Sequence, residues 1–389
     1  MNSGRTVFAQ LLDFLPKHEF NKCIERYRGH RRLRSFSCLD QFLCMAFAQL
    51  TYRDSLRDIE TCLRAMSSNL YHAGFRGAIS RSTLADANER RDWRIYSDFA
   101  HVLIAHARQL YANEPFAVDL DQPAYAFDST TIDLCLALFP WAKFRRRKGA
   151  VKLHTMIDLH GNIPCFIHIT DGKTNDVKAL DEFVPEPTAF YMMDRGYVDF
   201  RRLYRFTENL AYFVIRAKRN LDYARRSHRR VDKSTGLRSD QTIVLRGVKT
   251  SLQYPVPLRR ISYRDADTGK RFVFLTNNFH LPALTIPQLY KCRWQVELFF
   301  KWIKQNLRIK TFFGASPNAV RTQVWISISV YVLVAILKKE LNVDRSLNEI
   351  LQILSITLFE KTQLFTMLNA PGEQKEKSPS HKQLTLFDI

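Results

Sequence analysis

The sequence lacks the usual marks of a zinc-bound, disulfide-bonded or membrane-spanning protein. Its seven cysteines include no CxxC pair, and its histidines form no cluster with zinc-ligand spacing. The longest apolar stretch, residues 324–337, has 14 residues, which is too short to span a bilayer and predicts a buried helix. The first residues, MNSGRTVFAQ, have no signal-peptide apolar region. We therefore expect a cytoplasmic protein, outside any membrane, with reduced and mostly buried cysteines.

Acidic residues are also scarce relative to basic ones. The chain has 59 Lys and Arg against 38 Asp and Glu, a net charge of +21, and its pI is about 9.8. Such an excess indicates a polyanionic partner. Ribosomal and membrane-surface proteins share this bias. Here, however, the charge is spread through sequence of globular composition, which favours a groove for DNA or RNA.

Helical patterns dominate residues 1–115. Apolar residues recur at helical spacing after Ser37, a predicted N-cap, and a second helix is expected to start at Ser82. The second region begins with polar and basic residues that suit a helix in a DNA major groove, although a charged face in a helix bundle explains them equally well. These residues are Arg81, Asn88, Arg90, Arg91 and Arg94. We predict a helical N-terminal DNA-binding domain.

From about residue 116 the pattern changes to alternating strands and helices. The predicted strands are 124–134, 151–159, 163–170, 189–193 and 211–218, and the predicted helices are 175–184 and 198–210. This order predicts a mixed α/β sheet. Residues 220–283 look like a β-rich insertion within a catalytic domain of residues 116–340. Residues 341–389 are predicted to form a C-terminal helical segment and, from about Gly372, a disordered tail.

A helix predicted over residues 286–307 has an unusual polar face. One carboxylate, Glu297, lies in a row of otherwise basic or hydroxyl side chains on this face. The row comprises Tyr290, Arg293, Lys301, Lys304 and Arg308. Ion pairs on a solvated surface are the ordinary explanation of such a face. A helix that binds a metal ion through its Glu and a phosphate backbone through its bases is the alternative.

Two aspartates are predicted at the ends of buried strands. Asp128 follows AYAF, and Asp194 follows FYMM and precedes Arg195-Gly196-Tyr197. A carboxylate in such a place is costly unless it is paired or binds a cation, although each alone could simply cap a turn. Together with Glu297 they have the layout of a ribonuclease H-like metal site. Three carboxylates suit hard divalent cations, and two such ions can promote in-line displacement at phosphorus.

At these residues the sequence resembles a known family, the DDE transposases of bacterial insertion sequences, in the insertion sequence 4 group. The group's pattern Y-x2-R-x3-E-x6-K is matched by Tyr290, Arg293, Glu297 and Lys304. Asp128-Ser-Thr and Asp194-Arg-Gly-Tyr match the other two acidic motifs. The separations between the acids are 66 and 103 residues, and the longer one agrees with the family's β-rich insertion. The resemblance covers about residues 30–340.

The resemblance implies an α/β, ribonuclease H-like catalytic core and a role for each motif residue. Asp128, Asp194 and Glu297 would be the catalytic acids and bind two Mg²⁺ ions, or Mn²⁺ in their place. Tyr290, Arg293 and Lys304 would bind phosphates of the DNA. The reaction would be hydrolysis at the ends of the element and attack of the freed 3′-hydroxyl on target DNA. Family members act as dimers on paired ends, so a homodimer is expected on double-stranded DNA.

Two basic runs are predicted to contact the DNA backbone, which would make binding strongly salt-dependent. The first comprises Lys143, Arg145, Arg146, Arg147, Lys148 and Lys152, and the second Arg225, Arg226, Arg229 and Arg230. Trp294 and Trp302 flank the polar helix face, where core packing is favoured over stacking on a DNA base.

The last residues contain a separate motif. Gln383-Leu384-Thr385-Leu386-Phe387 resembles the short peptide by which bacterial proteins bind the replication sliding clamp. Apolar residues at the end of a polar tail have little structural purpose, so the sliding clamp is a predicted partner.

Two other functions use the same motifs. A ribonuclease H-like nuclease would cleave DNA with these acids and never join strands. A non-catalytic DNA-binding protein descended from a transposase would retain the basic surface. The intact acids favour an enzyme, and the basic motif residues and the insertion favour a transposase that works at DNA in the bacterial nucleoid.

Overall fold

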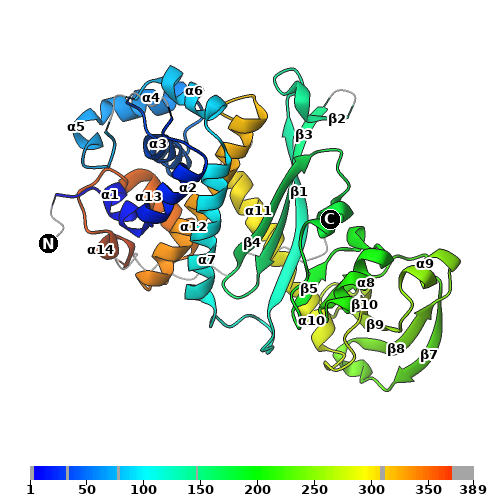
Figure 1. Cartoon of the computed structure of the whole chain (residues 1–389). Coiled ribbons are helices and arrows are strands. Elements are labelled where there is room, and N and C mark those ends of the chain that lie inside the picture. Colours follow the sequence, from blue (N-terminus) through cyan, green and yellow to red (C-terminus); the bar gives the residue numbers. More distant parts are fainter. Residues whose placement is uncertain (1–3, 32–34, 77–78, 146–147, 307–311, 370–389) are drawn as a thin grey trace. The chain divides into compact units, whose positions relative to one another are not determined.

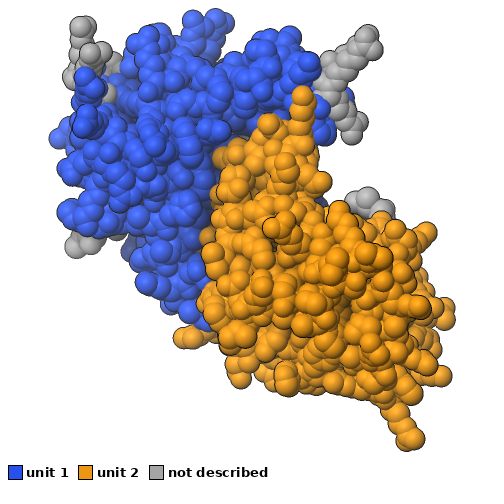
Figure 2. Space-filling view, turned by 45° about the vertical axis from the view of Figure 1, so that its right-hand side comes forward, with its two compact units in different colours: residues 1–112, 132–151, 300–374 blue, residues 113–131, 152–299, 375–389 orange. Residues whose placement is uncertain are grey.

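The computed structural model describes residues 4–31, 35–76, 79–145, 148–306 and 312–369. The chain forms two compact units, which Figure 2 shows in different colours. Unit 1 comprises residues 1–112, 132–151 and 300–374, and unit 2 comprises residues 113–131, 152–299 and 375–389. The first boundary lies close to the one predicted at residue 115. Residues 300–340, by contrast, were predicted within the catalytic domain and belong to the helical unit.

Unit 1 is built mainly from helices (Figure 1). They are α1 (Val7–Leu11), α2 (Lys17–Arg26), α3 (Cys38–Leu50), α4 (Leu56–Ala65), α5 (Ser67–Leu70), α6 (Arg81–Arg90), α7 (Arg94–Tyr111), α12 (Pro317–Glu340), α13 (Leu347–Thr357) and α14 (Leu364–Asn369), with the 3₁₀ turns η1 (Leu12–Phe14) and η2 (Pro140–Ala142). Helix α12 is the centre of the unit, and α3, α6, α7 and α13 contact it.

Helix α12 is long and apolar enough to cross a membrane by length and composition, but 94% of its most apolar window is buried inside the protein. The predicted buried helix is therefore present, and it is longer than the apolar stretch that predicted it. A helix that is apolar on all sides needs neighbours on all sides, and the bundle around α12 provides them.

Local capping explains where two of the helices begin. Ser37 caps α3 as predicted, and its capping box with Asp40 is complete. The prediction of Ser82 as a cap is wrong, because the hydroxyl of Ser80 accepts the hydrogen bond from the Thr83 N–H and α6 begins at Arg81. Both candidates are serines close to the helix start, and the sequence pattern does not separate them.

Two polar residues predicted to face DNA instead join helices inside unit 1. Asn88 on α6 is buried, and its side-chain oxygen accepts a hydrogen bond of 2.8 Å from Gln41 on α3. Arg91 donates to the Gln41 side-chain oxygen over 3.1 Å. These contacts satisfy polar groups that burial would otherwise penalise.

The seven cysteines are all free thiols. Cys23, Cys38 and Cys44 are buried, whereas Cys135 is exposed and the remaining three are half-buried. The expectation of mostly buried thiols therefore holds for only part of the set.

The described strands form one mixed sheet, most of which belongs to unit 2. They are β1 (Ala124–Leu134), β2 (Lys143–Arg145), β3 (Lys148–Asp158), β4 (Ile163–Asp171), β5 (Phe190–Met193), β6 (Tyr212–Arg216), β7 (Tyr223–Arg229), β8 (Leu237–Leu245), β9 (Leu258–Arg264) and β10 (Arg271–Thr276). The order is β2-β3-β1-β5-β6-β10-β9-β8-β7, with β4 also paired to β3.

The core of this sheet has the predicted ribonuclease H-like arrangement. Its five strands lie in the order β4-β3-β1-β5-β6, and β5 runs parallel to both β1 and β6. The β-rich insertion continues the same sheet, because β10 pairs antiparallel with β6 and is followed by β9, β8 and β7. The predicted fold class, an α/β core with a β-rich insertion after a helical N-terminal region, is confirmed.

Short helical segments connect the strands of unit 2. They are α8 (Phe200–Glu208), α9 (Val248–Gln253), η3 (Asp176–Glu182), η4 (Arg195–Tyr197) and η5 (Lys233–Thr235). Helix α8 packs against β6 and matches the helix predicted over 198–210. The helix predicted over 175–184 is instead the 3₁₀ segment η3, which ends where Phe183 turns extended before Pro185.

The helix predicted over 286–307 is divided in two. Helix α10 (Thr285–Cys292) has Arg293 as its C-cap, and α11 (Trp294–Asn306) begins at the next residue. At the junction the Arg293 N–H donates to the Tyr290 carbonyl and the Val296 N–H donates to the Arg293 carbonyl. These i→i+3 bonds are tighter than those of an α-helix. The single Arg at the break is a site residue.

Candidate active site

Three adjacent strands of unit 2 end their paired segments in charged residues. In the parallel pairs, Phe127 on β1 lies opposite Met193 on β5, and Met193 lies opposite Ile215 on β6. The next residue of each strand is Asp128, Asp194 and Arg216, respectively. Ligand sites in sheets with parallel strands commonly form beyond the carboxyl ends of the strands.

Asp128 does not stand at the end of its strand, as predicted, because β1 continues to Leu134. It stands where the pairing of β1 with β5 ends. Its side chain is only 19% exposed and accepts a 2.6 Å hydrogen bond from Nη1 of Arg293. Burial raises the pKa of Asp128 to about 6, while Arg293 and the Ser129 N–H act in the opposite direction.

Asp194 follows β5 and leads into the 3₁₀ turn η4. The hydroxyl of Tyr290 on α10 donates a 3.2 Å hydrogen bond to its Oδ1. The ring of Tyr290 packs against Phe274 on β10, with 4.9 Å between the centroids. Burial raises the pKa of Tyr290 above its ordinary value, so the phenol remains a proton donor at neutral pH.

Arg293 connects the first acid to the third. Its Nη1 donates to Asp128, and its Nη2 donates to Oε1 of Glu297, one turn further along. The Arg293 side chain is 15% exposed and that of Glu297 is 32% exposed. Burial works against the charge of Arg293, but Tyr290, Asp128 and Glu297 together outweigh it and raise its pKa. The guanidinium therefore stays charged.

The donor set of this cluster fits divalent cations. Asp128, Asp194 and Glu297 offer only carboxylate oxygens, the ligands that Mg²⁺ and Mn²⁺ prefer. A positive group, the Arg293 guanidinium, already lies between two of them. In this arrangement the described residues contain no three Asp, Glu, His or Cys side chains close enough to hold a metal ion. Asp128, Asp194 and Glu297 could therefore provide metal ligands. Arg293, however, is hydrogen-bonded to a carboxylate oxygen of Asp128 and to one of Glu297.

The other predicted site residues have different surroundings. Lys304 lies on α11, about two turns after Glu297, and is half-buried in the part of the helix that belongs to unit 1. Arg145 ends β2. Arg146 and Arg147 lie outside the described residues, as do the polar tail and the clamp motif Gln383–Phe387.

The two predicted basic runs differ in exposure. Lys152 is not a surface residue, because its ammonium group is largely buried and donates to Asp176 and to the Thr174 carbonyl. The run on β7 is exposed and includes Arg225 and Arg226. Trp302 packs edge-on against Tyr331 within unit 1, with centroids 4.4 Å apart, which agrees with the predicted packing role.

Arg216 was missed in the sequence, although it carries the same signal as the two aspartates. It is a charged residue at the end of the apolar strand YFVIR. Its guanidinium lies over the ring of Phe272, 5.0 Å from the centroid, and its charge acts on Tyr290. Position at a strand end would have identified it.

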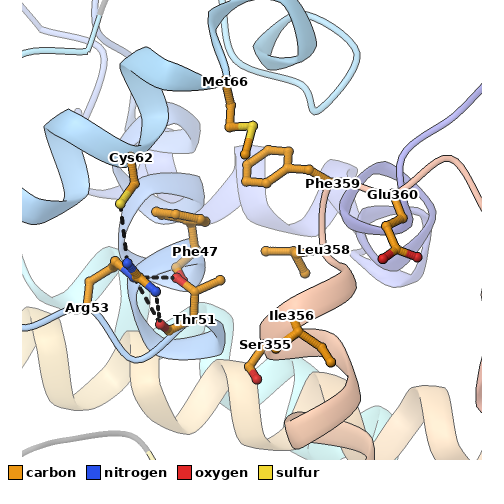
Figure 3. A pocket seen from close by; sticks show the side chains of 10 residues that line it. All are labelled: Phe47, Thr51, Arg53, Cys62, Met66, Ser355, Ile356, Leu358, Phe359 and Glu360. Atoms are coloured by element: carbon orange, nitrogen blue, oxygen red, sulfur yellow. Dashed lines mark hydrogen bonds between the residues drawn. The ribbon is translucent and has the colours of Figure 1, made fainter.

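A cavity of about 430 Å³ in unit 1 is a different kind of site (Figure 3). Phe47, Met66 and Phe359 give it an apolar lining, and Arg53 at its edge donates to Thr51. None of its lining residues is one of the predicted site residues. It has no arrangement of acids or bases suited to phosphate chemistry.

Comparison with known proteins identifies the family of the chain. The family described as "Transposase DDE domain" matches residues 119–333, more than half of the chain, and this range contains all three acids. The chain belongs to the DDE transposase family. Residues 3–76 of this transposase match a further family, described as a domain of unknown function, DUF4372.

Similar proteins carry transposase names. The chain is 31% identical over 304 residues to a protein named as the transposase y4zB of Sinorhizobium fredii, which covers 77% of this chain and 82% of that one. It is 34% identical over 231 residues to the one named for insertion sequence element IS5377 of Geobacillus stearothermophilus, covering 58% and 60%. It is 22% identical to the one named for IS4SA of Synechocystis, covering 82% and 88%. The predicted membership among insertion-sequence DDE transposases is thus confirmed.

A solved structure of piggyBac transposase in a synaptic complex with hairpin DNA also matches the transposase. The match covers 96% of this chain and 80% of the other, at 12% identity and a TM-score of 0.45.

Proposed function

We propose that this DDE transposase acts by cut-and-paste: it binds the ends of an insertion sequence, cleaves them and joins their 3′-hydroxyl groups to target DNA. The observation that carries this proposal is the meeting of Asp128, Asp194 and Glu297 through Arg293 and Tyr290. Three separate elements, β1, the turn after β5 and α11, contribute these acids. Asp128, whose burial raises its pKa, is bonded through Arg293 to a second acid, and such a perturbed carboxylate favours a chemical role over a structural one.

In the proposed reaction, Asp128, Asp194 and Glu297 would provide the ligands of two Mg²⁺ ions. When bound, the ions would activate the attacking oxygen and stabilise the leaving oxygen. Water first attacks the phosphorus at the end of the element, and the bond to the 3′-oxygen breaks. The freed 3′-hydroxyl then attacks a phosphodiester of the target, forming one phosphorus–oxygen bond and releasing one target 3′-oxygen.

We also propose that Tyr290, Arg293 and Lys304 bind phosphates of the strand that is cut, as in the insertion sequence 4 group. Their donors are a phenol, a guanidinium and an ammonium, all suited to phosphate oxygens. The arginines at β2 and on β7 would contact the DNA backbone further away. A homodimer on paired DNA ends and a sliding clamp bound through residues 383–387 complete the proposed partners.

The test uses the full-length protein and a duplex taken from the DNA that borders its gene. Asp128→Asn, Asp194→Asn and Glu297→Gln should each reduce Mg²⁺-dependent cleavage by about 10³-fold or more, while DNA binding persists. Asp181→Asn is a matched control, because Asp181 is an exposed acid of the same unit paired with Arg202. Its cleavage should equal that of the wild type.

Retained cleavage in all three site variants would contradict the proposed site. A second assay supplies pre-cut ends and a target plasmid, and it measures joined product. Cleavage without joining would identify a nuclease of the same fold. Binding without cleavage in the wild type would identify a non-catalytic DNA-binding protein.

A further inference from the structure

The contacts of Arg293 in the structure differ from the contacts its proposed role requires. A residue that binds phosphate should present its N–H groups to the substrate. Here Nη1 faces Asp128 at 2.6 Å, and Nη2 faces Glu297. Its buried Nε has no hydrogen-bond partner among the described residues. The guanidinium is therefore directed at two acids and still has an unused donor.

Tyr290 is likewise hydrogen-bonded to the remaining acid, Asp194. Its hydroxyl donates to Asp194, and Arg293 lies over its ring at 5.7 Å from the centroid. Each of the three acids therefore contacts one of two motif residues that the proposed function directs to DNA. Arg293 bonds to Asp128 and Glu297, Tyr290 bonds to Asp194, and the cation–ring contact between Arg293 and Tyr290 brings the two groups together.

A guanidinium and a divalent cation compete for the same carboxylate oxygens. Arg293 cannot yield by losing its proton, because arginine remains charged in proteins and the acids raise its pKa further. In a half-buried site the repulsion between two such cations is weakly screened. Arg293 must therefore leave Asp128 and Glu297 before both acids can bind a divalent ion.

The backbone provides a place for that change. Arg293 is the single residue between α10 and α11, where the hydrogen bonds change from the i→i+4 to the i→i+3 pattern. A side chain at such a junction can be redirected without disturbing the apolar residues on either helix. Val296, Phe299 and Phe300 hold α11 in the core.

We propose that Arg293 is an internal counter-ion that moves from Asp128 and Glu297 to a DNA phosphate and so couples metal binding to DNA binding. Without DNA it neutralises the two acids and keeps their affinity for divalent ions low. An arriving phosphate takes over the guanidinium and frees the carboxylates. This inference rests on the proposed function, and it adds that the metal site is completed only on the substrate.

The test measures Mn²⁺ binding to the full chain by calorimetry, without DNA and with the duplex that borders the gene. Removing the competing charge with Arg293→Gln should tighten DNA-free Mn²⁺ binding by about tenfold or more, within the usual range of coupling between sites. DNA should tighten Mn²⁺ binding in the wild type, and by a much smaller factor in Arg293→Gln. A purely structural Arg293 would give the variant weaker binding in both conditions.

Arg202→Gln is the matched control. Arg202 also bridges two aspartates of unit 2, Asp181 and Asp199, but it lies outside the site. Its loss lowers the net charge by the same amount, so its Mn²⁺ affinity should equal that of the wild type. If thermal melting shows that Arg293→Gln is unfolded, Arg293→Lys replaces it, because a single ammonium lacks the fork that bridges both acids. DNA-free affinity should again rise.

The outcomes separate the inference from the proposed function. Equal or weaker DNA-free Mn²⁺ binding in the folded Arg293 variant overturns the counter-ion inference and leaves the transposase proposal intact. Absence of Mn²⁺ binding in wild type and variant, with and without DNA, overturns the metal role of the acids and the inference with it.

Discussion

Burial determines which protonation states the individual residues of unit 2 can hold. His154 is buried and Asp128 is mostly buried, on neighbouring strands, and burial shifts the pKa of each toward its neutral form. Asp128 has Arg293 as a compensating partner. The imidazole of His154 lies 2.9 Å through Nε2 from the hydroxyl of Thr170, and its Nδ1 has no hydrogen-bond partner among the described residues. His154 therefore has less compensation than Asp128 for the cost of carrying a charge in a buried place.

His154 should make unit 2 sensitive to mild acid. Burial lowers its pKa from 6.5 to about 4, with Asp176 opposing the change. The unfolded chain therefore takes up the proton first, and stability is lost as the pH falls from 6.5 toward 4. The full loss is about 3 kcal/mol, because each tenfold difference in proton affinity between the folded and unfolded chain corresponds to about 1.4 kcal/mol. His154→Gln should have a flatter pH profile of the unfolding midpoint over this window.

His18→Gln is the control, because His18 is exposed on α2 in the other unit. Its pH profile should follow that of the wild type. If His154→Gln and the wild type lose stability in parallel between pH 6.5 and 4, the buried imidazole is not the acid-sensitive group.

The site acids could be predicted from the sequence, but their contacts could not. Asp128 and Asp194 stand out because apolar strand residues precede them, and Glu297 because bases surround it. The bond between Arg293 and Asp128 joins residues 165 positions apart. Spacing along the chain carries no information about such a contact, because the contact depends on how the segments between the two residues fold. The burial of His154 also depends on the tertiary fold, so the sequence did not single out this residue.

At the scale of elements, apolar periodicity located the strands well and the short helices poorly. Strand β1 has the predicted bounds, and β4 differs from its prediction by one residue at one end. The division at Arg293 was missed because the apolar positions on both sides keep a helical period, and a single i→i+3 step leaves that period almost unchanged. Strand β7 was missed because its sequence, YARRSHR, lacks alternating apolar residues.

Strand β7 permits two explanations of its arginines. It is the last strand in the order of the sheet, and residues 225–229 are exposed on both faces. Charged side chains on an edge strand prevent pairing with another molecule. The same side chains can contact a phosphate backbone, and the proposed DNA substrate makes this second explanation testable.

Arg225→Gln with Arg226→Gln should weaken DNA binding and reduce the slope of log affinity against log salt by about 2, one for each lost phosphate contact. Fluorescence anisotropy at several salt concentrations measures both quantities. Arg201→Gln with Lys249→Gln removes the same charge from exposed positions on α8 and α9 and should leave the slope unchanged. An unaltered slope in the β7 variant, together with aggregation, would favour edge protection.

At the scale of the whole molecule, the compact units do not follow the order of the chain. Helix α12 was predicted as part of the catalytic domain because it follows the last motif directly. The transposase domain match includes most of this helix, which also packs with α3 and α7, more than 200 residues earlier in the chain. A helix that is apolar on all sides signals burial but does not indicate which neighbours provide it.

The net charge of +21 gives the last prediction, which concerns the complete chain. Each phosphate that a Lys or Arg neutralises releases counter-ions, so log affinity should fall linearly with log salt. If the transposase makes about 6 to 10 such contacts, its DNA affinity should fall by about 10³–10⁵ between 50 and 200 mM salt. Glu297→Gln should give the same or a slightly steeper slope, since it removes no basic group and takes away an acid that repels the phosphates. A slope near zero would mean that the positive charge serves solubility. The partner of the protein would then not be a polyanion.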